Sequence, residues 1–156
     1  MILELKKLHE NATLPERATE LAGGWDVTAV EIEKVSDNFV ICHLGFALAM
    51  PEGYKLTLVP RSSLTKTNWV LTNSPGLGDC DYRGEFQLRF RGIPTGIDDL
   101  NRLYHKLTYD KFPFEVNERV GQVYLEEVIP MEFKVVEELS ETKRGDGGFG
   151  STNEKK

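Results

Sequence analysis

The stretch NSPGLGDCDYRGE, residues 73–85, places turn signals between two apolar runs and therefore indicates a β fold. Its Pro-Gly pair predicts a β-hairpin followed by an emerging strand. On a regular strand Asp79 and Asp81 share one face, whereas Cys80 and Tyr82 point to the other. Two carboxylates beside a turn can bind a metal, activate a water or merely cap the turn. The stretch alone leaves these alternatives open.

Strand patterns continue on both sides of this stretch. Short runs with period-2 or β-branched character, separated by turn signals, begin at Leu3, Trp25, Asn38, Tyr54, Asn68, Glu85, Arg119 and Met131. Only SSLTKTN after Arg61 and GIDDLNRLYHKL from Gly96 have a helical character, and both are short. We therefore predict an all-β domain, a sandwich, jelly roll or closed barrel, with a short helix and a flexible Gly-rich C-terminal arm.

The composition narrows the class of protein. The chain has 156 residues, of which 40% are hydrophobic, so it can form one domain with a real core. No run is long and apolar enough to span a membrane, and the charged start MILELKKLHE does not resemble a signal peptide, so we expect an intracellular protein. The net charge of −6 argues against stable nucleic-acid binding. Two cysteines form no disulfide framework.

The segment PRSSLTKTN from Pro60 is a candidate phosphate site. A strand that runs into a short helix exposes backbone N–H groups at the helix start, and Ser62 and Ser63 add hydroxyls there. Arg61 adds a positive charge. The alternative is ordinary helix capping by one of the two serines.

Two segments nearer the C-terminus hold further candidates. In ERVGQVYLEEV, Gln122 lies between valines and needs polar partners, which are either backbone groups or a ligand. The tail RGDGGFGSTNEKK offers Arg144, Ser151 and Thr152 for phosphate and Phe149 for stacking on a base. The alternative for the tail is a solvated Gly-rich end.

The order of these segments carries more information than any one of them. AGGWDV at Ala22, PRSSL at Pro60, NSPGLGDCDYRGE at Asn73, ERVGQV at Glu118 and RGDGGFGST at Arg144 resemble the five motifs of the trimeric dUTP pyrophosphatase (dUTPase) family. The resemblance covers nearly the full length. It implies a jelly-roll homotrimer with active sites at the subunit interfaces. It also implies that a C-terminal arm, residues 144–156, leaves the domain of residues 1–143 to close a neighbour's site.

The resemblance also implies roles for individual residues. Asp79 would activate the water that attacks the α-phosphorus, and Tyr82 would pack against the deoxyribose and exclude a 2′-hydroxyl. The uracil edge would be recognised by Asn73, Gly76, Leu77, Gly78 and Gln87. The phosphates and the closing arm would involve Arg61, Ser62, Ser63, Gln122, Arg144, Gly150, Ser151 and Thr152, with Phe149 covering the base. Asp26 would support Mg²⁺ through water.

The implied reaction is hydrolysis of dUTP to dUMP and pyrophosphate, with Mg²⁺ on the triphosphate. Such an enzyme limits uracil incorporation into DNA and supplies dUMP for dTMP synthesis, in the cytoplasm, or in the host cytoplasm if the source is viral. A dCTP deaminase is the nearest alternative, although DCDYRGE favours the pyrophosphatase. Gly78 replaces a β-branched residue of the family, which predicts a looser turn and weaker uracil selectivity.

The segment between the third and fourth motifs, residues 92–117, is longer than in compact members of the family. One interpretation is a surface excursion. The other is a contact surface for a protein partner, which would make the chain a regulatory binding module. The candidate anchors for such a partner are Tyr104, Tyr109, Phe112 and Phe114.

Overall fold

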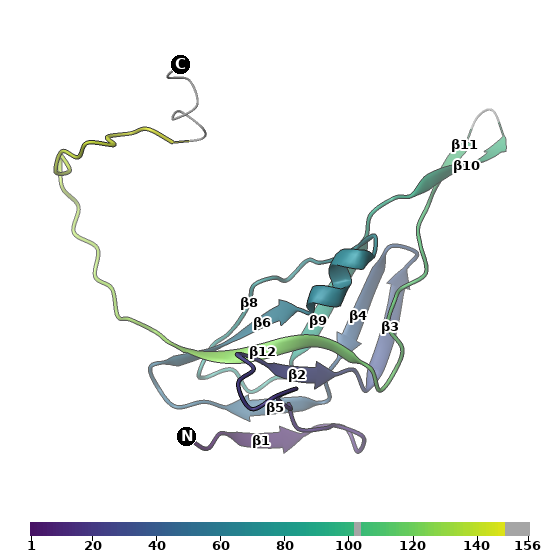
Figure 1. Cartoon of the computed structure of the whole chain (residues 1–156), viewed down its shortest axis with the longest axis horizontal. Coiled ribbons are helices and arrows are strands. Elements are labelled where there is room, and N and C mark those ends of the chain that lie inside the picture. The colour runs from purple at the N-terminus through teal and green to yellow at the C-terminus, as the bar shows by residue number, and fades with distance from the viewer. Residues whose placement is uncertain (102–103, 149–156) are drawn as a thin grey trace.

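The computed structural model describes residues 1–101 and 104–148 and is built almost entirely of antiparallel strands (Figure 1). One four-stranded sheet has the order β2 (Trp25–Thr28), β12 (Arg119–Glu127), β6 (Tyr54–Pro60), β8 (Gly76–Gly78). The other has the order β3 (Glu31–Ser36), β4 (Phe39–His43), β9 (Gln87–Gly92), β7 (Trp69–Leu71). Strands β1 (Glu4–Lys7) and β5 (Phe46–Ala49) form a separate pair. The predicted all-β, jelly-roll-like fold is confirmed.

The core lies between the two larger sheets, because their strands alternate between buried and outward side chains. On β9, Leu88 and Phe90 are fully buried, whereas Gln87 and Arg89 point away from the core. The buried cluster includes Val27 of β2, Leu58 of β6 and residues of β4, β5 and β12. This alternation directs the polar residues of β9 toward the surface on which the candidate site lies.

The predicted hairpin of residues 73–85 is wrong in its topology. Strand β8 pairs with β6 in one sheet, and β9 pairs with β4 and β7 in the other. The chain therefore crosses between sheets, and Asp79, Cys80 and Asp81 lie in the crossing turn rather than on a strand. The expectation that the two aspartates share a strand face does not apply to such a turn.

The two stretches predicted to be helical behave differently. A 3₁₀ helix, η1, covers Ser62–Lys66. The residues GIDDLNRLYHKL instead form the hairpin of β10 (Gly96–Asn101) and β11 (Tyr104–Thr108), which projects from the body (Figure 1). Pairing places Ile97 opposite Leu107 and Asp98 opposite Lys106, and such apolar and opposite-charge cross-strand pairs stabilise a hairpin.

The chain that follows this hairpin is fastened to the body by aromatic side chains. Phe112 packs edge-on against Trp69 with ring centroids 5.0 Å apart, and both Phe112 and Phe114 pack against buried Phe90. Phe112 and Phe114 therefore fasten the excursion to its own core, and their role as anchors for a partner stays a prediction. Tyr109 is half-buried, and the side chain of Tyr104 lies outside the described part of the chain.

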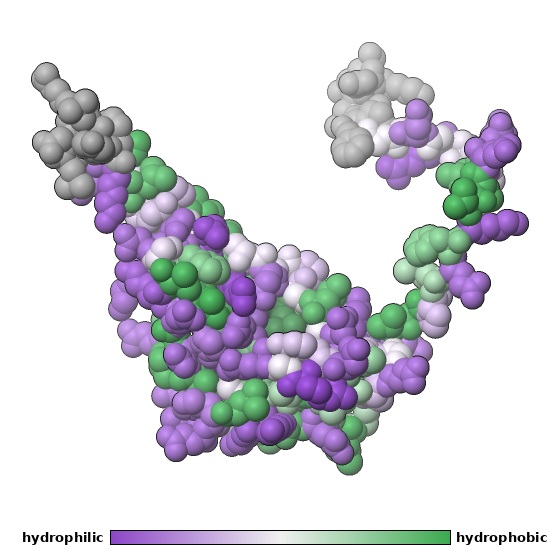
Figure 2. All heavy atoms as spheres, turned by 180° about the vertical axis from the view of Figure 1, so that it is seen from behind, coloured by the Kyte–Doolittle hydropathy of each residue, from purple (hydrophilic) through white to green (hydrophobic). Residues whose placement is uncertain are grey.

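Beyond β12 the C-terminal segment, residues 128–148, runs away from the body as extended chain (Figure 1). Residues 131–139 were predicted to be a strand but are not one here, because within the described residues no strand lies beside them to pair with. Their apolar side chains are exposed, with Phe133 at 89% and Val135 at 97% (Figure 2). In residues 1–101 and 104–148, no helix has the length and apolar character needed to cross a membrane.

Candidate functional site

A pocket of about 280 Å³ lies where the chain crosses from β8 to β9. We call it the β8–β9 pocket. Six of the residues predicted from the sequence line it, namely Asn73, Gly76, Leu77, Asp79, Tyr82 and Gln87. The remaining lining residues are Leu58, Glu85, Phe86 and Arg89. The fold therefore brings together the residues that were assigned to the base, the sugar and the attacking water.

Asn73 closes one side of this pocket by binding strand β9. Its side-chain Nδ2 donates to the carbonyl of Gln87 at 3.0 Å, and its Oδ1 accepts from the N–H of Arg89 at 2.9 Å. The amide thus pairs with β9 as a neighbouring peptide would. Both ends of the side chain are engaged, so Asn73 shapes the pocket, and the polar groups left to face it include nearby backbone groups.

Those backbone groups belong to β8. This strand is the last in its sheet, and β6 is its only partner among the described strands. The other edge of Gly76–Gly78 therefore carries N–H and C=O groups that no described strand pairs. A side chain does not fit at position 76, because a Cβ there would lie 2.9 Å from the carbonyl oxygen of Asn73. The glycine also lets a ligand come close to the backbone of this edge.

Gly78 lies behind the pocket, where it faces the ring of Phe86. A Cβ at this position would lie 2.5 Å from Phe86 Cε1, which is too close for any side chain larger than hydrogen. Phe86 in turn packs edge-on against Tyr82, with ring centroids 5.3 Å apart. The space that a β-branched residue would fill is therefore occupied by an aromatic ring, and the glycine is matched to it.

Tyr82 and Asp79 are held together by the crossing turn. The backbone N–H of Tyr82 donates to the carbonyl of Asp79 at 3.1 Å, and the Tyr82 hydroxyl donates to the carbonyl of Glu85 at 3.0 Å. The Asp79 side chain is exposed at the pocket wall. A carboxylate in this position can accept a proton from a water molecule that enters the pocket.

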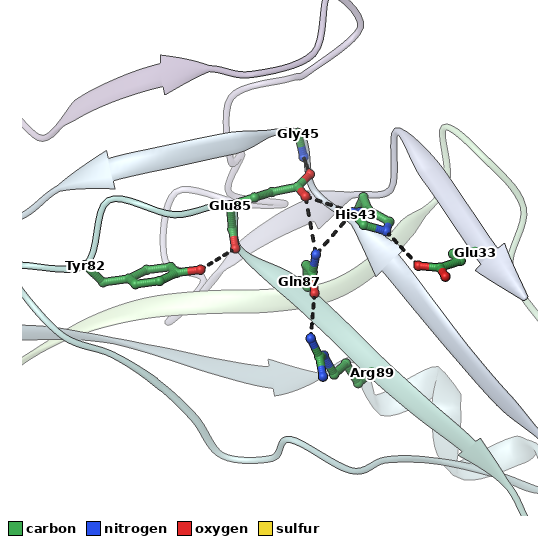
Figure 3. A network of polar contacts seen from close by, with 7 residues as sticks. All are labelled: Glu33, His43, Gly45, Tyr82, Glu85, Gln87 and Arg89. Carbon is green, nitrogen blue, oxygen red and sulfur yellow. Dashed lines mark hydrogen bonds and ion pairs between the residues drawn. The ribbon is translucent and has the colours of Figure 1, made fainter. Parts of the chain in front are cut away.

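Glu85 connects the pocket to the end of β4 and the turn that follows it (Figure 3). Its Oε1 accepts the N–H of Gly45 at 2.9 Å, and its Oε2 lies 2.8 Å from Nδ1 of His43. Gln87 Nε2 lies 3.2 Å from Nδ1 of His43 and 3.4 Å from the same Oε2, and Gln87 Oε1 accepts from Arg89 at 3.1 Å. The Nε2 of His43 lies 3.5 Å from Glu33.

These contacts shift the pKa values of both partners. Burial by itself lowers the pKa of His43, but the hydrogen bond and charge of Glu85, helped by Glu33 and Glu31, raise it above its ordinary value of 6.5. Burial likewise raises the pKa of Glu85. Hydrogen bonds from His43, Gly45 and Gln87 outweigh that effect, so the pKa of Glu85 lies below 4.5. The two shifts widen the pH range over which His43 and Glu85 are both charged.

A second group of polar residues surrounds Asp26, which is only 4% exposed. We call it the Asp26 cluster. Its Oδ1 forms an ion pair with Arg61 Nε at 3.3 Å and accepts from Gln122 Nε2 at 3.1 Å, and its Oδ2 accepts from Arg119 Nη1 at 3.1 Å. The three elements are adjacent because β12 pairs with both β2 and β6. The side-chain N–H of Gln122 thus has a buried carboxylate as its partner within the chain, rather than a backbone group.

The remaining predicted residues lie outside both groups. Ser62 and Ser63 are exposed on η1, and neither caps it, because the cap residue is Arg61 and no side chain closes the helix. The capping interpretation is therefore wrong. Arg144 lies in the C-terminal segment, where its Nε donates to the carbonyl of Gly147 at 2.8 Å. Phe149, Gly150, Ser151 and Thr152 lie outside the described residues.

The chain offers few direct ligands for a metal. In the described part of the chain, no three histidine, cysteine, aspartate or glutamate side chains come together in a way that could hold one. Both oxygens of Asp26 already accept hydrogen bonds from cationic or amide groups. Asp26 is therefore suited to holding arginines in place, and a metal near it would need most of its ligands from water or a substrate.

Several residues of these networks were not singled out from the sequence, among them Glu85, His43 and Arg119. Glu85 and Arg119 lie inside the quoted segments, where each looks like one more surface charge. His43 lies 42 positions from Glu85, and Arg119 lies 93 positions from Asp26. Only the pairing of β4 with β9 and of β2 with β12 brings these partners together, and no local pattern encodes it.

Comparison with known proteins agrees with this geometry. A family model described as dUTPase matches residues 10–91. A deoxyuridine 5'-triphosphate nucleotidohydrolase of Hydrogenobaculum sp. is 38% identical and aligns over 99% of this chain and 100% of the relative. An enzyme of the same name from Helicobacter pylori (strain P12) is 34% identical over 97% of each chain.

Solved structures show the same fold. The dUTPase of Staphylococcus bacteriophage 80alpha with dUpNHpp superimposes with a TM-score of 0.78 and 25% identity, over 96% of this chain and 97% of that one. A point mutant of the dUTPase from phage phi11 of S. aureus superimposes with a TM-score of 0.68 and 21% identity, over 90% and 100%. The latter structure is described as coordinating a structural Mg(II) ion.

Proposed function

The chain belongs to the dUTPase family, and from this membership we propose that it hydrolyses dUTP to dUMP and pyrophosphate. The observation that carries the proposal is the β8–β9 pocket, in which an exposed carboxylate, a tyrosine ring and an unpaired strand edge meet. Each of these groups matches one requirement of the reaction. The reaction class itself follows from the names of relatives that cover nearly the whole chain.

The base is recognised by the free edge of β8. The hydrogen-bonding edge of uracil has one N–H donor between two carbonyl acceptors. The N–H and C=O groups of a strand edge can complement this pattern. Asn73 supports this recognition by holding β9 at a fixed distance through its two hydrogen bonds. A pocket built on such backbone groups rejects a mispaired base strongly, because polar groups would be left without partners.

The sugar and the attacking water are placed by the crossing turn. Tyr82 presents its ring to the deoxyribose, and its orientation is fixed by the bond to the Glu85 carbonyl and by the Phe86 ring. A 2′-hydroxyl would meet this ring, which favours deoxynucleotides. Asp79 accepts the proton of the water as it attacks the α-phosphorus, and a positioned base of this kind contributes roughly 10²–10⁴-fold to a rate.

The phosphate chain is bound by Arg61, Ser62, Ser63 and Gln122. Arg61 and Gln122 are held from behind by Asp26, which fixes their direction before a substrate arrives. Mg²⁺ neutralises the triphosphate oxygens when it is bound. The scarcity of protein ligands around Asp26 supports a metal held by substrate oxygens and water, with Asp26 acting through water and through its arginines.

Each active site of the proposed enzyme would be formed by residues from more than one subunit. None of Arg61, Ser62, Ser63 or Gln122 lines the β8–β9 pocket of its own chain. The C-terminal segment leaves the body with the side chains of Phe133 and Val135 exposed to solvent. Contact with another subunit would bury them, which is favourable for apolar side chains. We therefore propose a homotrimer in which Arg144, Phe149, Gly150, Ser151 and Thr152 of one subunit close another subunit's site, in the cytoplasm where nucleotides are found.

The experiment that tests this function is pyrophosphate release from purified protein with Mg²⁺, measured with dUTP, dTTP, dCTP and UTP in parallel. Release from dUTP alone is expected. Release from UTP at a similar rate would contradict the role of Tyr82, and release from dTTP or dCTP would contradict recognition by the β8 edge. Ammonia release from dCTP would replace the proposal with a deaminase.

A further inference from the structure

We propose that Glu85 is a positioning residue for the β8–β9 pocket, and that His43, which lies outside the pocket, sets how firmly Glu85 holds it. The inference rests on the proposed hydrolysis of dUTP. It starts from the position of Glu85, whose main chain accepts the Tyr82 hydroxyl and whose side chain reaches the turn after β4 (Figure 3).

The turn after β4 provides a firm attachment. Gly45 has a φ of 69°, and a Cβ there would lie 2.8 Å from Val30, so only glycine fits. The adjacent chain is pinned as well, because the N–H of Phe86 donates to the carbonyl of Phe46 and the carbonyl of Phe86 accepts from Leu44. Glu85 and Phe86 therefore connect this turn to the pocket wall, and a shift of Glu85 would move Tyr82.

The direction of the hydrogen bonds follows from the chemistry of the groups. Arg89 can only donate, so the Gln87 atom that it contacts is oxygen and the Gln87 nitrogen faces Glu85. The Glu85 carboxylate can only accept, so Nδ1 of His43 carries a proton at 2.8 Å from it. Glu85 Oε2 thus accepts from two donors, of which only His43 can gain a positive charge.

The charges around His43 give the interaction a pH dependence. Glu85 and Glu33 contact the ring and Glu31 acts from a greater distance, whereas the nearest positive side chain of the network, Arg89, is separated from it by Gln87. The raised pKa of His43 means that the imidazolium contribution is complete below pH 6.5 and is lost as the pH rises through the folded-state pKa. The lowered pKa of Glu85 means that its contribution is complete above pH 4.5 and is lost as the pH falls.

The test compares Glu85→Gln and His43→Gln with wild type in steady-state dUTP hydrolysis between about pH 6 and about pH 9. Glu85→Gln keeps the shape of the side chain and removes its charge. His43→Gln keeps a donor that cannot titrate. We expect both to raise KM for dUTP by about tenfold near pH 6, with kcat within about threefold, because a charge-assisted bond that positions the substrate is weakened. The ratio of the His43→Gln KM to the wild-type KM should approach one as the pH rises.

Ionisation of the substrate affects the KM of the variant and of wild type equally, so it cancels in the ratio of the two KM values. Matched controls are Glu52→Gln, an exposed carboxylate on the β5–β6 turn, and His9→Gln, and both should behave as wild type. Urea unfolding confirms that each variant is folded at the assay temperature. An active wild type with unchanged KM in both variants, or with a pH-independent ratio, would overturn this inference alone. A wild type that neither hydrolyses dUTP nor binds dUMP would overturn the proposed function and this inference with it.

Discussion

The β8–β9 pocket and the Asp26 cluster differ in how much of a site one chain supplies. The pocket is closed by hydrogen bonds from Asn73, Tyr82 and Glu85 and by the Phe86 ring, all within the same chain. The Asp26 cluster holds Arg61 and Gln122 in place, but the described chain puts no pocket between them and Asp79. If the proposed function holds, the base end is preorganised in one subunit and the phosphate end requires assembly.

Asp79→Asn gives the largest expected effect and tests whether binding and chemistry separate at the base end. We expect kcat for dUTP to fall by roughly 10²–10⁴-fold, because the amide cannot accept the proton of the attacking water. The Kd for dUMP, measured by calorimetry, should stay within about threefold, since the pocket walls are unchanged. Asp81→Asn, in the same turn but outside the pocket lining, is the matched control. Equal losses in both variants would contradict the assignment of Asp79.

Removal of residues 144–156 tests whether the phosphate end depends on the C-terminal arm. We expect kcat/KM for dUTP to fall by roughly 100-fold, because closure of the site and exclusion of water are lost. Binding of deoxyuridine should weaken less than binding of dUTP, since deoxyuridine loses only the cover of Phe149 and has no phosphates for Arg144, Ser151 and Thr152. Removal of residues 153–156 alone is the control. A truncated protein that fails to assemble, as judged by light scattering, would show that the arm is structural first.

Asp26→Asn should have a smaller effect, confined to the phosphate end. Loss of the carboxylate leaves Arg61 and Arg119 close together without their shared anion. Because both arginines are partly exposed, we expect a stability loss of about 1–3 kcal/mol in urea unfolding, below the value for a fully buried pair. KM for dUTP should rise about tenfold with deoxyuridine binding unchanged. Glu16→Gln, an exposed carboxylate next to Asp26, is the control, and a loss of deoxyuridine binding in Asp26→Asn would show that the two ends are coupled.

The sequence predicted the base end better than it predicted the architecture around it. Period-2 runs identified nearly all strands, since alternation follows directly from burial of one sheet face. The helix expected from Gly96 was wrong because cross-strand partners such as Ile97 and Leu107 are not visible in a local pattern. The strand expected from Met131 was wrong because its pattern needs a neighbouring strand that the described chain does not supply. Both errors come from the same cause, which is that pairing is not local.

The same cause explains the site residues that were missed. Asp79, Tyr82 and Asn73 lie within 13 consecutive residues, so a motif could hold them together. Glu85 and His43 meet only because β4 and β9 are neighbours in register, with His43 opposite Gln87. Arg119 reaches Asp26 only because β12 lies between β2 and β6. Sequence reasoning therefore finds the residues that line the pocket more readily than the residues that hold them in place.

Gly78→Ala gives the smallest expected effect and tests whether the base end is as closely packed as the Phe86 contact indicates. The added Cβ would lie 2.5 Å from Phe86, and overpacking of this kind costs about 1–3 kcal/mol of stability. KM for dUTP should rise only a few-fold, because Tyr82 is displaced through Phe86 rather than directly. Phe86→Leu creates room, so the double variant should recover part of the loss, and a double-mutant cycle measures the coupling.

The outcome of that cycle separates two views of the glycine. If Gly78 loosens the crossing turn, as its sequence context suggests, then Gly78→Ala should stabilise the protein and reduce turnover of dTTP. If the glycine is matched to Phe86, the single variant should be destabilised, and discrimination against dTTP should worsen because the β8 edge is pushed out of line. We expect the second result, since Gly78 is buried against an aromatic ring and leaves no space that a side chain could fill. Independent, additive effects of the two substitutions would show that the rings behind the pocket do not set its shape.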